Sequence, residues 1–417
     1  MLELSPTLSQ NNRLHHSKAL QSIKEHIEGL PTPLYLYHEA ELNQAVNTYR
    51  SLFPRNARGF YALKANPQAA IVNHFSTLGI GAEVTGNLEW EISRSAHVAT
   101  ENILVGGVAK SESFLETVCH KGAAAVVIES ESEWQRLQRV TAVSHSTQIL
   151  LRINPGISFG GLNMAGGSQF GLSTDQALHI AKQCTENDHI EFLGLHFYFG
   201  SQRLEIEPIL QAIDVVEATI QTFQEAKLNV RIVDLGLGLG VPYLARDDAL
   251  DISSLREQLQ QKWQNSVWHD IEIWYEAGRA LVATSGYFIA RVIDRKELHG
   301  ETFIFLDGGL NVHNPGVGLG MFLRRNPQFH FITESSAEDT ETINIVGNLC
   351  TTADTLGTKV TAPTLREGDL VVIPNAGAYC QTTAMWGFNS QPLFQEGMLT
   401  QDGLFNAFKP QHQPLIK

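Results

Sequence analysis

The sequence lacks the features of a membrane or secreted protein. No apolar run in its 417 residues reaches the length needed to span a bilayer. The segment from Met1 to Lys24 is polar and lacks the charged region followed by an apolar region that marks a signal peptide. Basic residues form no block, and 30 Lys and Arg against 44 Asp and Glu give a formal net charge of −14. We therefore expect a cytoplasmic protein that binds neither membranes nor nucleic acid.

Cysteine is also scarce. The four cysteines are Cys119, Cys184, Cys350 and Cys380, and none stands in a paired spacing. This argues against a disulfide framework and against a zinc site, so we expect no metal. Most free cysteines are small buried hydrophobic residues, and a catalytic role for any of them needs a separate reason. The chain contains no internal repeat, low-complexity tract or flexible linker, which predicts firmly joined domains.

Eight short apolar runs alternate with segments of helical periodicity. The runs are Gly59–Lys64, Gly81–Thr85, Asn102–Gly106, Ala123–Glu129, Gln148–Asn154, Ile190–Tyr198, Arg231–Leu237 and Ile271–Glu276. The clearest helical stripe runs from Ile206 to Phe223, and a helix over roughly Glu39 to Phe53 precedes the first run and would supply the eighth helix. This alternation fits a parallel (β/α)₈ barrel of the TIM type better than an open sheet.

After about Ser285 the pattern changes to short β-rich runs separated by Gly, Pro, Asn and Asp. The runs are Tyr287–Ile293, Thr302–Leu306, Ile343–Val346 and Leu370–Ile373. They predict an antiparallel β domain over residues 286–417, and we expect residues 1–38, including Pro33–Tyr37, to pack with it. The predicted barrel domain then covers residues 39–285.

Polar residues recur at or near the ends of the eight runs. They are Lys64, Glu83, Arg152, His196, Asp234 and Glu276. A lone lysine such as Lys64, followed by Asn66-Pro67, is usually a solvated surface residue. In a barrel, however, the loops after the strands converge on one mouth, where the chemistry takes place. The recurrence of such residues therefore favours a functional site.

A glycine-rich turn, Leu235-Gly236-Leu237-Gly238-Leu239-Gly240, follows the seventh run. Glycine permits positive φ and close approach, so the turn is suited to cradle a phosphate. It is not a dinucleotide fingerprint, because the G-x-G-x-x-G spacing is missing and Pro242 interrupts the helix start. A turn without a ligand is the alternative, and the place after strand seven favours phosphate.

The segment Glu276-Ala277-Gly278-Arg279 ends the eighth run. Its carboxylate is either a helix N-cap, half of an ion pair, or an anion that holds a proton on a heterocyclic nitrogen. Three later segments are each compatible with simple turns. They are Asp307-Gly308-Gly309, Cys350-Thr351-Thr352-Ala353-Asp354 and Gly377-Ala378-Tyr379.

Taken together, these motifs resemble one family. Tyr61-Ala62-Leu63-Lys64-Ala65-Asn66, the glycine turn, Glu276-Ala277-Gly278-Arg279, Cys350 to Asp354 and Gly377-Ala378-Tyr379 stand in the order and spacing of the fold-type III pyridoxal-phosphate decarboxylases, which share the barrel of alanine racemase. That group includes diaminopimelate, ornithine and arginine decarboxylases. The resemblance runs from about Thr32 to Pro392.

The resemblance implies a role for each matching residue. Lys64 would form the internal aldimine with pyridoxal 5′-phosphate, Glu276 would keep the ring nitrogen protonated, and Cys350 would reprotonate the carbanion. The positions that match phosphate contacts are Gly236, Gly238, Gly278, Arg279, Ser201 and Tyr379. Glu83, Arg152 and His196 match polar positions around the cofactor. Asp354 would come from the partner subunit, which implies a homodimer with shared sites.

Several residues depart from the family pattern. Tyr198 stands where better-known members stack a histidine on the cofactor ring, and an aromatic face can still stack there. Leu237 replaces a glycine of the phosphate turn, and Ala277 replaces a proline. Thr351 follows Cys350, where decarboxylases of free diamino acids carry an acid for the distal ammonium. Asp307 or Asp354 would be the substitutes for that acid.

Further stretches are similar to a branch that acts on conjugated amino acids, either siderophore intermediates or aminoacyl groups on carrier proteins. They are Arg152–Pro155, Met164–Gly171, Asp307–Asn311, Arg324–Pro327 and Leu349-Cys350-Thr351. We therefore predict decarboxylation of an amino acid or its conjugate, diaminopimelate-like or siderophore-related, with a carrier protein as a possible partner. Racemisation on the same fold and a non-catalytic pyridoxal-phosphate carrier are the alternatives. The acid Glu276 and the thiol Cys350 favour decarboxylation.

Overall fold

The computed structural model describes residues 20–141, 146–157, 162–163, 166–244, 247–314, 326–336 and 339–409. The chain divides into two compact units. The barrel unit comprises Val46–Gly240 and Leu250–Leu281, and the sheet unit comprises Met1–Ala45, Val241–Ala249 and Val282–Lys417. Each unit has its own β-sheet and is described by itself.

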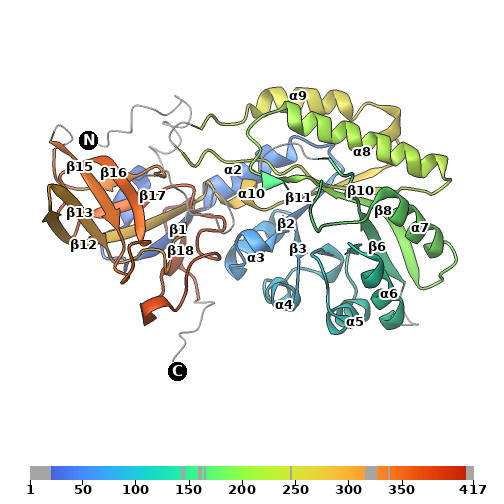
Figure 1. Ribbon diagram of the computed structural model, residues 1–417, viewed down its shortest axis with the longest axis horizontal. Helices are drawn as coiled ribbons and strands as arrows, with labels where there is room; N and C mark the ends of the chain where they lie inside the picture. The colour runs from blue at the N-terminus through green and yellow to red at the C-terminus, as the bar shows by residue number, and fades with distance from the viewer. Residues whose placement is uncertain are drawn as a thin grey trace. The chain divides into compact units, whose positions relative to one another are not determined.

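The barrel unit is a closed parallel barrel of eight strands, which confirms the predicted (β/α)₈ fold (Figure 1). Its strands are β2 (Arg58–Ala62), β3 (Gly81–Val84), β4 (Ile103–Val105), β5 (Ala125–Ile128), β6 (Thr147–Arg152), β8 (Ile190–Tyr198), β10 (Ile232–Gly236) and β11 (Glu272–Ala277). The helices between them are α3 (Ala69–Thr77), α4 (Asn87–Ser95), α5 (Glu112–Lys121), α6 (Glu131–Val140), α7 (Thr174–Cys184), α8 (Glu207–Glu225) and α9 (Ile252–Lys262). The pairing of β11 with β2 closes the barrel.

Side-chain caps determine where several barrel helices begin. Ser111, Ser130 and Ser173 precede α5, α6 and α7, and each hydroxyl accepts the N–H of the residue three positions on. Asp251 does the same for α9 by accepting from Ser253 and Ser254. Each cap satisfies a backbone donor that the helix leaves unpaired, so each of these helices begins directly after its capping residue.

The chain before the first barrel strand also packs on the barrel. Helix α2 (Glu39–Arg50) lies where the sequence predicted a helix before the first strand. The ring of Phe53 stacks on Tyr275 of β11 at 4.4 Å, and Tyr49 lies 5.6 Å from the same ring. The Trp263 indole N–H donates to the carbonyl of Leu52 at 2.9 Å. These aromatic contacts attach the end of α2 and the following turn to the outside of β11.

An apolar cluster fills the barrel below the strand ends. Its members are Phe60, Leu104, Ala124, Ala125, Val127, Leu150, Leu193, Ile232 and Trp274, all fully or almost fully buried. Side chains two positions apart on a strand face the same side. Glu129, Arg152, Asp234 and Glu276 stand two positions beyond Val127, Leu150, Ile232 and Trp274, so they form a charged layer directly above an apolar floor.

Most predicted strands differ from the observed ones by one or two residues at their ends. The largest consequence concerns Lys64, which was predicted at a strand end. Strand β2 stops at Ala62, and Leu63–Ala65 form a 3₁₀ turn, η1. The Tyr61 hydroxyl donates to the Asn66 carbonyl at 2.9 Å, and the Asn66 side chain accepts the Gln68 N–H at 3.1 Å. These bonds fold the chain back after β2, so Lys64 sits on the turn. The small β7 (Leu162–Asn163) and β9 (Gly200–Ser201) pair was not predicted.

The sheet unit contains a nine-stranded sheet that is mostly antiparallel, as predicted. Its strands are β1 (Leu34–His38), β12 (Gly286–Leu298), β13 (Glu301–Leu306), β14 (His330–Ile332), β15 (Thr340–Val346), β16 (Thr355–Pro363), β17 (Leu370–Ile373), β18 (Gln395–Leu399) and β19 (Phe405–Ala407). The pairs β1–β18 and β13–β15 are parallel, which the sequence did not indicate. Long connections separate both pairs along the chain, so no hairpin requires them to run antiparallel.

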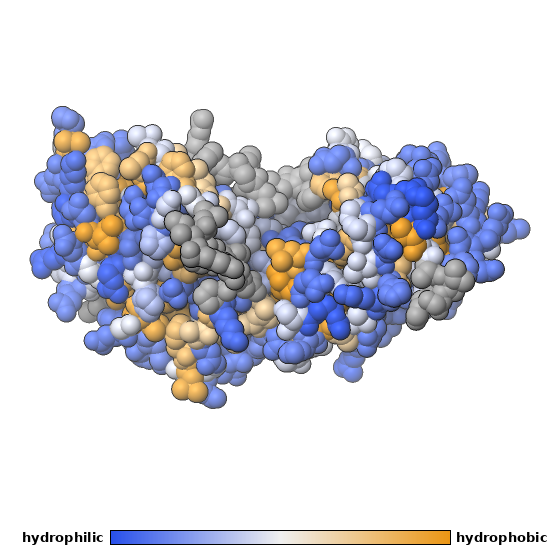
Figure 2. Space-filling model, turned by 90° about the horizontal axis from the view of Figure 1, so that it is seen from below, coloured by the Kyte–Doolittle hydropathy of each residue, from blue (hydrophilic) through white to orange (hydrophobic). Residues whose placement is uncertain are grey.

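The remaining helical segments are short. They are η2 (Thr100–Asn102), η3 (Ser266–Trp268), α10 (Arg279–Val282) and η4 (Phe388–Ser390), and residues 20–26 are helical as well. Within the described residues, none of the helices combines the length and apolar character that crossing a bilayer requires. On the face drawn in Figure 2, hydrophobic residues form separate areas among hydrophilic ones.

Gly194 tests the closure of the barrel. It lies on β8 opposite Ile232 of β10, and a Cβ at this position would overlap the Ile232 carbonyl oxygen. We expect Gly194→Ala to lower the free energy of unfolding by about 3 kcal/mol or more, because backbone cannot yield as a flexible side chain does. The matched control is Gly86→Ala, where a Cβ meets nothing within 4 Å. Urea unfolding monitored by circular dichroism measures both, and equal losses would contradict this explanation.

Candidate functional site

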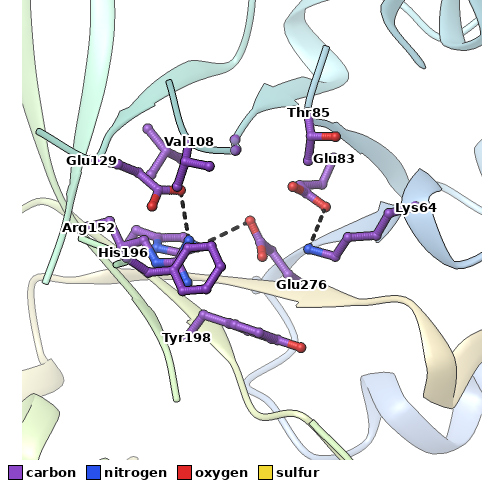
Figure 3. Close-up of a pocket in the computed structure, with 13 residues that line it drawn as sticks. Lys64, Glu83, Thr85, Val108, Glu129, Arg152, His196, Tyr198 and Glu276 are labelled. Atoms are coloured by element: carbon purple, nitrogen blue, oxygen red, sulfur yellow. Dashed lines mark hydrogen bonds and ion pairs between the residues drawn. The ribbon is translucent and has the colours of Figure 1, made fainter. Parts of the chain in front are cut away.

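A cavity of about 300 Å³ opens above the charged layer at the C-terminal ends of the barrel strands. Its walls come from residues on or just after β2, β3, β4, β5, β6, β8 and β11, several of which are labelled in Figure 3. The lining residues are Lys64, Glu83, Thr85, Gly106, Gly107, Val108, Val127, Glu129, Arg152, Phe170, His196, Tyr198 and Glu276. Of the polar residues that the sequence predicted at strand ends, Lys64, Glu83, Arg152, His196 and Glu276 thus meet in one cavity.

Lys64 and Glu83 form an ion pair in the cavity. The Lys64 Nζ lies 3.6 Å from Glu83 Oε2, and the lysine side chain is 35% exposed while the glutamate is buried. Burial raises the pKa of Glu83 to about 8, although the charge of Lys64 opposes the rise. The amine also lies 5.3 Å from the centre of the Tyr198 ring. An amine held at the open end of such a cavity can reach a bound molecule.

Arg152 is fixed by a carboxylate and lies beside two aromatic rings. Its Nη1 donates to Glu129 Oε1 at 2.7 Å. The guanidinium lies 4.7 Å from the Phe170 ring and 5.8 Å from the Tyr198 ring. Its buried Nη2 has no hydrogen-bond partner among the described residues. Arg152 therefore presents a charged donor to the cavity.

A second buried ion pair supports this wall from behind. Lys110 Nζ lies 2.7 Å from Glu133 Oε1, and both side chains are 0% exposed. The same ammonium donates to the carbonyls of Gly107 at 2.6 Å and Val127 at 2.7 Å, which belong to two lining residues. Glu133 in turn accepts the backbone N–H of Glu129 at 3.4 Å. The pair thus fixes the loop after β4 and the end of β5 to each other.

Glu276 forms the base of the cavity beside His196. The His196 Nε2 lies 3.4 Å from Glu276 Oε1 and 3.9 Å from Asp234 Oδ2. Burial alone would raise the pKa of Glu276, but its interaction with His196, together with the charges of Lys64 and Arg152, outweighs burial and lowers the pKa to about 2. Glu276 is therefore an anion at neutral pH, and one of its buried oxygens has no hydrogen-bond partner among the described residues.

The glycine turn lies beside a second polar pair. Gly238 has φ +65°, and a Cβ there would overlap the carbonyl oxygen of Gly200, so only glycine fits. A Cβ at Gly236 would overlap the Tyr198 ring, and one at Gly278 would crowd Ala65 at 3.0 Å. The Arg279 Nε donates to Ser201 Oγ at 3.2 Å, and both residues are buried.

Comparison with known proteins identifies the family. A model of the pyridoxal-binding domain of pyridoxal-dependent decarboxylases matches residues 39–283. The chain belongs to the pyridoxal-dependent decarboxylase family. Its cofactor is pyridoxal 5′-phosphate, as the sequence predicted.

Three known proteins illustrate the similarity. The L-glutamyl-[BtrI acyl-carrier protein] decarboxylase of Niallia circulans is 29% identical, over 84% of each chain. The 2-[(L-alanin-3-ylcarbamoyl)methyl]-2-hydroxybutanedioate decarboxylase of Staphylococcus aureus is 27% identical, over 92% of this chain and 98% of that one. The crystal structure of diaminopimelate decarboxylase from Helicobacter pylori complexed with L-lysine has a TM-score of 0.82 at 25% identity, and the match covers 94% of this chain and 95% of that one.

The residues of the decarboxylase barrel fit pyridoxal phosphate. The cofactor needs an amine for its aldehyde, an anion for its ring nitrogen and donors for its phosphate. Lys64 and the ionised Glu276 meet the first two needs within one cavity, and Tyr198 offers an aromatic face beside them. The turn at Gly238, where the positive φ and the close contact with Gly200 require glycine, is of the glycine-rich kind whose backbone N–H groups bind a phosphate.

The other predicted site residues lie in the sheet unit of the decarboxylase. Cys350 is exposed, and its N–H donates to Asn389 Oδ1 at 3.1 Å. Thr351 Oγ1 accepts the Ala353 N–H at 3.2 Å. Tyr379 is buried with φ +65°, and its carbonyl accepts the Thr383 N–H at 3.0 Å. The structure therefore describes these residues in a different unit from Lys64.

The two aspartates predicted near the substrate are engaged within the sheet unit. Asp354 is 2% exposed, and its two oxygens accept the N–H groups of Leu310 at 2.7 Å and Leu349 at 2.9 Å. Asp307 accepts from the Thr32 hydroxyl at 2.5 Å and from the Arg291 N–H at 2.9 Å. Burial raises the pKa of Asp307. Both carboxylates thus hold backbone segments together.

Sequence reasoning missed several residues of the decarboxylase site. Glu129 ends the predicted run Ala123–Glu129 and stands two positions after Val127, a signal that could have identified it. Phe170 and the Lys110–Glu133 pair gave no such signal, because their importance depends on contacts made across the barrel. Of the stretches quoted for the conjugate-specific branch, Met164, Ala165, Arg324 and Arg325 lie outside the described residues.

Glu83 gives the decarboxylase a pH-dependent stability. The pKa of Glu83 is about 8 in the folded protein, whereas that of a solvated glutamate is about 4.3. Between about pH 4.3 and about pH 8 the folded state binds one more proton than the unfolded state. The free energy of unfolding of the wild type therefore falls as the pH rises through this range. We expect Glu83→Gln to become progressively more stable relative to wild type between about pH 4.3 and about pH 8. Urea titrations across this range measure the difference, and a difference independent of pH would contradict the assignment.

The Lys110–Glu133 pair gives a second prediction. We expect Lys110→Met to lower the free energy of unfolding by about 3–5 kcal/mol, because it leaves the Glu133 carboxylate buried without its counter-charge. The matched control is Arg139→Met, which removes one partner of the exposed Arg139–Glu112 pair and should cost less than about 1 kcal/mol. Chemical denaturation measures both variants, and similar losses would refute the importance of burial.

Proposed function

We propose that the protein removes the α-carboxyl group from a conjugated amino acid. In such a substrate the side-chain nitrogen is acylated, or a carboxyl group is bonded to a carrier. The observation that carries the proposal is Thr351, which follows Cys350 in the segment Leu349-Cys350-Thr351. A threonine hydroxyl carries no charge and cannot compensate the distal ammonium of a free diamino acid. Such an ammonium in a partly buried site needs an anion beside it.

The neighbouring acids are poor substitutes for the missing anion. Asp354 is the only acidic residue in loop 347–354, and both its oxygens already accept backbone N–H groups. Asp307 is held by Thr32 and Arg291 in the same way. Turning either carboxylate toward a substrate would leave buried N–H groups unpaired, at about 1–3 kcal/mol for each group. A substrate without a distal ammonium avoids this cost.

The names of two relatives support this choice. One acts on a glutamyl group attached to an acyl-carrier protein. The name of the other describes an alanine whose third carbon bears an amide-linked acid. A carrier-tethered or amide-linked amino acid is therefore the substrate class that we propose here, and a carrier protein is a proposed partner.

We further propose a role for each side chain in the reaction. When bound, pyridoxal phosphate supplies an aldehyde that joins an amine and a conjugated ring that accepts the electron pair left by the departing CO₂. Lys64 would hold the cofactor by its aldehyde carbon. Glu276 holds a proton on the ring nitrogen, and Tyr198 orients the ring. Cys350 donates a proton to the α-carbon, which completes the replacement of carboxylate by hydrogen.

The remaining groups bind and orient. Arg152 and Glu83 hold polar groups around the reacting carbon, and His196 supports Glu276. Gly236, Gly238 and Gly278 would hold the phosphate, with Ser201 and Arg279 as donors, and the family resemblance gives Tyr379 the same role. We assign the barrel domain to residues 39–285 and the β domain to residues 1–38 and 286–417. We propose a homodimer in which Cys350 serves the partner's barrel, while Asp354 fixes the loop that carries Cys350.

A substrate comparison tests the proposal. We expect the purified holoenzyme to release CO₂ from an Nβ-acylated 2,3-diaminopropionate with a kcat/KM at least about tenfold above that for meso-diaminopimelate or ornithine, since one charged hydrogen bond is worth about 1.5–3 kcal/mol. Inversion of configuration without CO₂ release would instead indicate a racemase. A high kcat/KM for diaminopimelate or ornithine would contradict the proposed substrate class.

Restoring an acid at position 351 is the converse test. We expect Thr351→Asp to shift the ratio of kcat/KM values toward diaminopimelate by about 10- to 100-fold, because it supplies the missing anion. The matched control is Thr352→Asp, which adds the same charge to the neighbouring exposed residue and should leave the ratio near its wild-type value. An equal shift in both variants would attribute the effect to net charge rather than to position 351.

A further inference from the structure

Asp234 lies behind the cofactor site and does not line the cavity. It stands in the middle of β10, where its register partners are His196 on β8 and Trp274 on β11. Its side chain is 0% exposed. The apolar floor lies one inward-facing position below it, at Ile232. Asp234 is therefore enclosed between hydrocarbon below and the charged residues of the cavity above.

Three titratable groups share this enclosed space. A ring nitrogen of His196, a carboxylate oxygen of Asp234 and a carboxylate oxygen of Glu276 all lie within 4.8 Å of one another. The His196 Nε2 is closer to Glu276, at 3.4 Å, than to Asp234, at 3.9 Å. Neither oxygen of Asp234 meets a hydrogen-bond partner at normal distance among the described residues. Two further titratable groups interact electrostatically with Asp234, namely Glu83 of β3 and Tyr49 of α2.

Two carboxyl groups this close cannot both be ionised in a dry site. Their repulsion and the loss of hydration keep a proton on one of them. The cationic groups of the cavity select which one. Lys64 and Arg152 act on Glu276 together with His196, whereas Asp234 faces the floor and has only the longer contact with His196. The negative charge therefore stays on Glu276, and the proton stays on Asp234.

We propose that Asp234 is a positioning residue that remains protonated in the active enzyme and thereby keeps Glu276 ionised and oriented under the cofactor's ring nitrogen. This inference rests on the proposed contact between Glu276 and that nitrogen. Burial raises the pKa of Asp234 well above its ordinary value, and the charge of Glu276 raises it further, which agrees with the geometry. The neutral acid can donate its O–H toward Glu276 or His196, which an anion at the same position could not do.

The first test examines the apoprotein and needs no catalysis. We expect the infrared spectrum of wild-type apoprotein at neutral pH to contain the C=O stretching band of a protonated carboxylic acid that is missing from Asp234→Asn. The difference between the two spectra separates Asp234 from Glu83, whose proton is present in both proteins. The matched control is Asp270→Asn at an exposed aspartate, which should leave the acid band unchanged. If wild type and Asp234→Asn show the same acid bands, Asp234 is ionised or binds a cation, and the proposal is overturned.

The second test follows the ring nitrogen directly. Holoenzyme loaded with ¹⁵N-labelled pyridoxal phosphate reports protonation of that nitrogen by its NMR chemical shift. Asparagine keeps the shape, the neutrality and a donor, so Asp234→Asn should retain the wild-type shift. Asp234→Leu removes the donor, and we expect a shift toward unprotonated nitrogen with a kcat lower by about 10- to 100-fold, as for other residues that support a ligating group.

The outcomes separate the possibilities. If the ring nitrogen loses its proton in Asp234→Asn as completely as in Asp234→Leu, the charge of Asp234 matters and the proposal is overturned. If Asp234→Leu behaves like wild type, Asp234 has no role at the ring nitrogen and the proposal is also overturned. If Asp234→Leu does not fold, the infrared comparison and Asp234→Asn still decide. Glu276→Gln tests the underlying contact separately. An unchanged nitrogen shift in Glu276→Gln would refute that contact, while the infrared band of Asp234 would stand on its own.

Discussion

The structure depends on a carboxylate that remains ionised inside a barrel. Glu276 is 6% exposed and lies above a floor of hydrocarbon. A charge in such a place costs several kcal/mol unless its neighbours compensate it. His196, Lys64 and Arg152 provide that compensation, and each of these is held in turn by a further partner. The site is therefore a layer of mutually dependent charges whose positions the barrel strands determine.

This layer explains why the barrel carries so many buried polar residues. The strand period places Glu129, Arg152, Asp234 and Glu276 on the inner face, one step above Val127, Leu150, Ile232 and Trp274. The apolar side chains close the barrel and exclude water from below, and the resulting low dielectric strengthens every interaction above them. The buried Lys110–Glu133 pair lies behind this layer. It joins the loop after β4 to the end of β5, and both of these segments line the cavity.

Much of this arrangement could be predicted from the sequence. The alternation of apolar runs with amphipathic segments indicated the barrel, and the recurrence of polar residues at strand ends indicated the mouth. The sequence predicted Lys64 where a strand ends and a turn begins. It did not show that the strand stops two residues earlier, at Ala62, because that end depends on a hydrogen bond from the Tyr61 hydroxyl to the Asn66 carbonyl. The parallel pairs in the sheet unit and the buried position of Asp354 also escaped prediction, since both result from contacts between segments far apart in the chain.

We infer that the charged layer serves one amine, that of Lys64. The most direct measurement is to treat the holoenzyme with borohydride, digest it, and locate the peptide that retains the reduced cofactor by mass spectrometry. We predict a single labelled peptide with the modification on Lys64. Label on another lysine, or no label in a protein that still decarboxylates, would contradict the account.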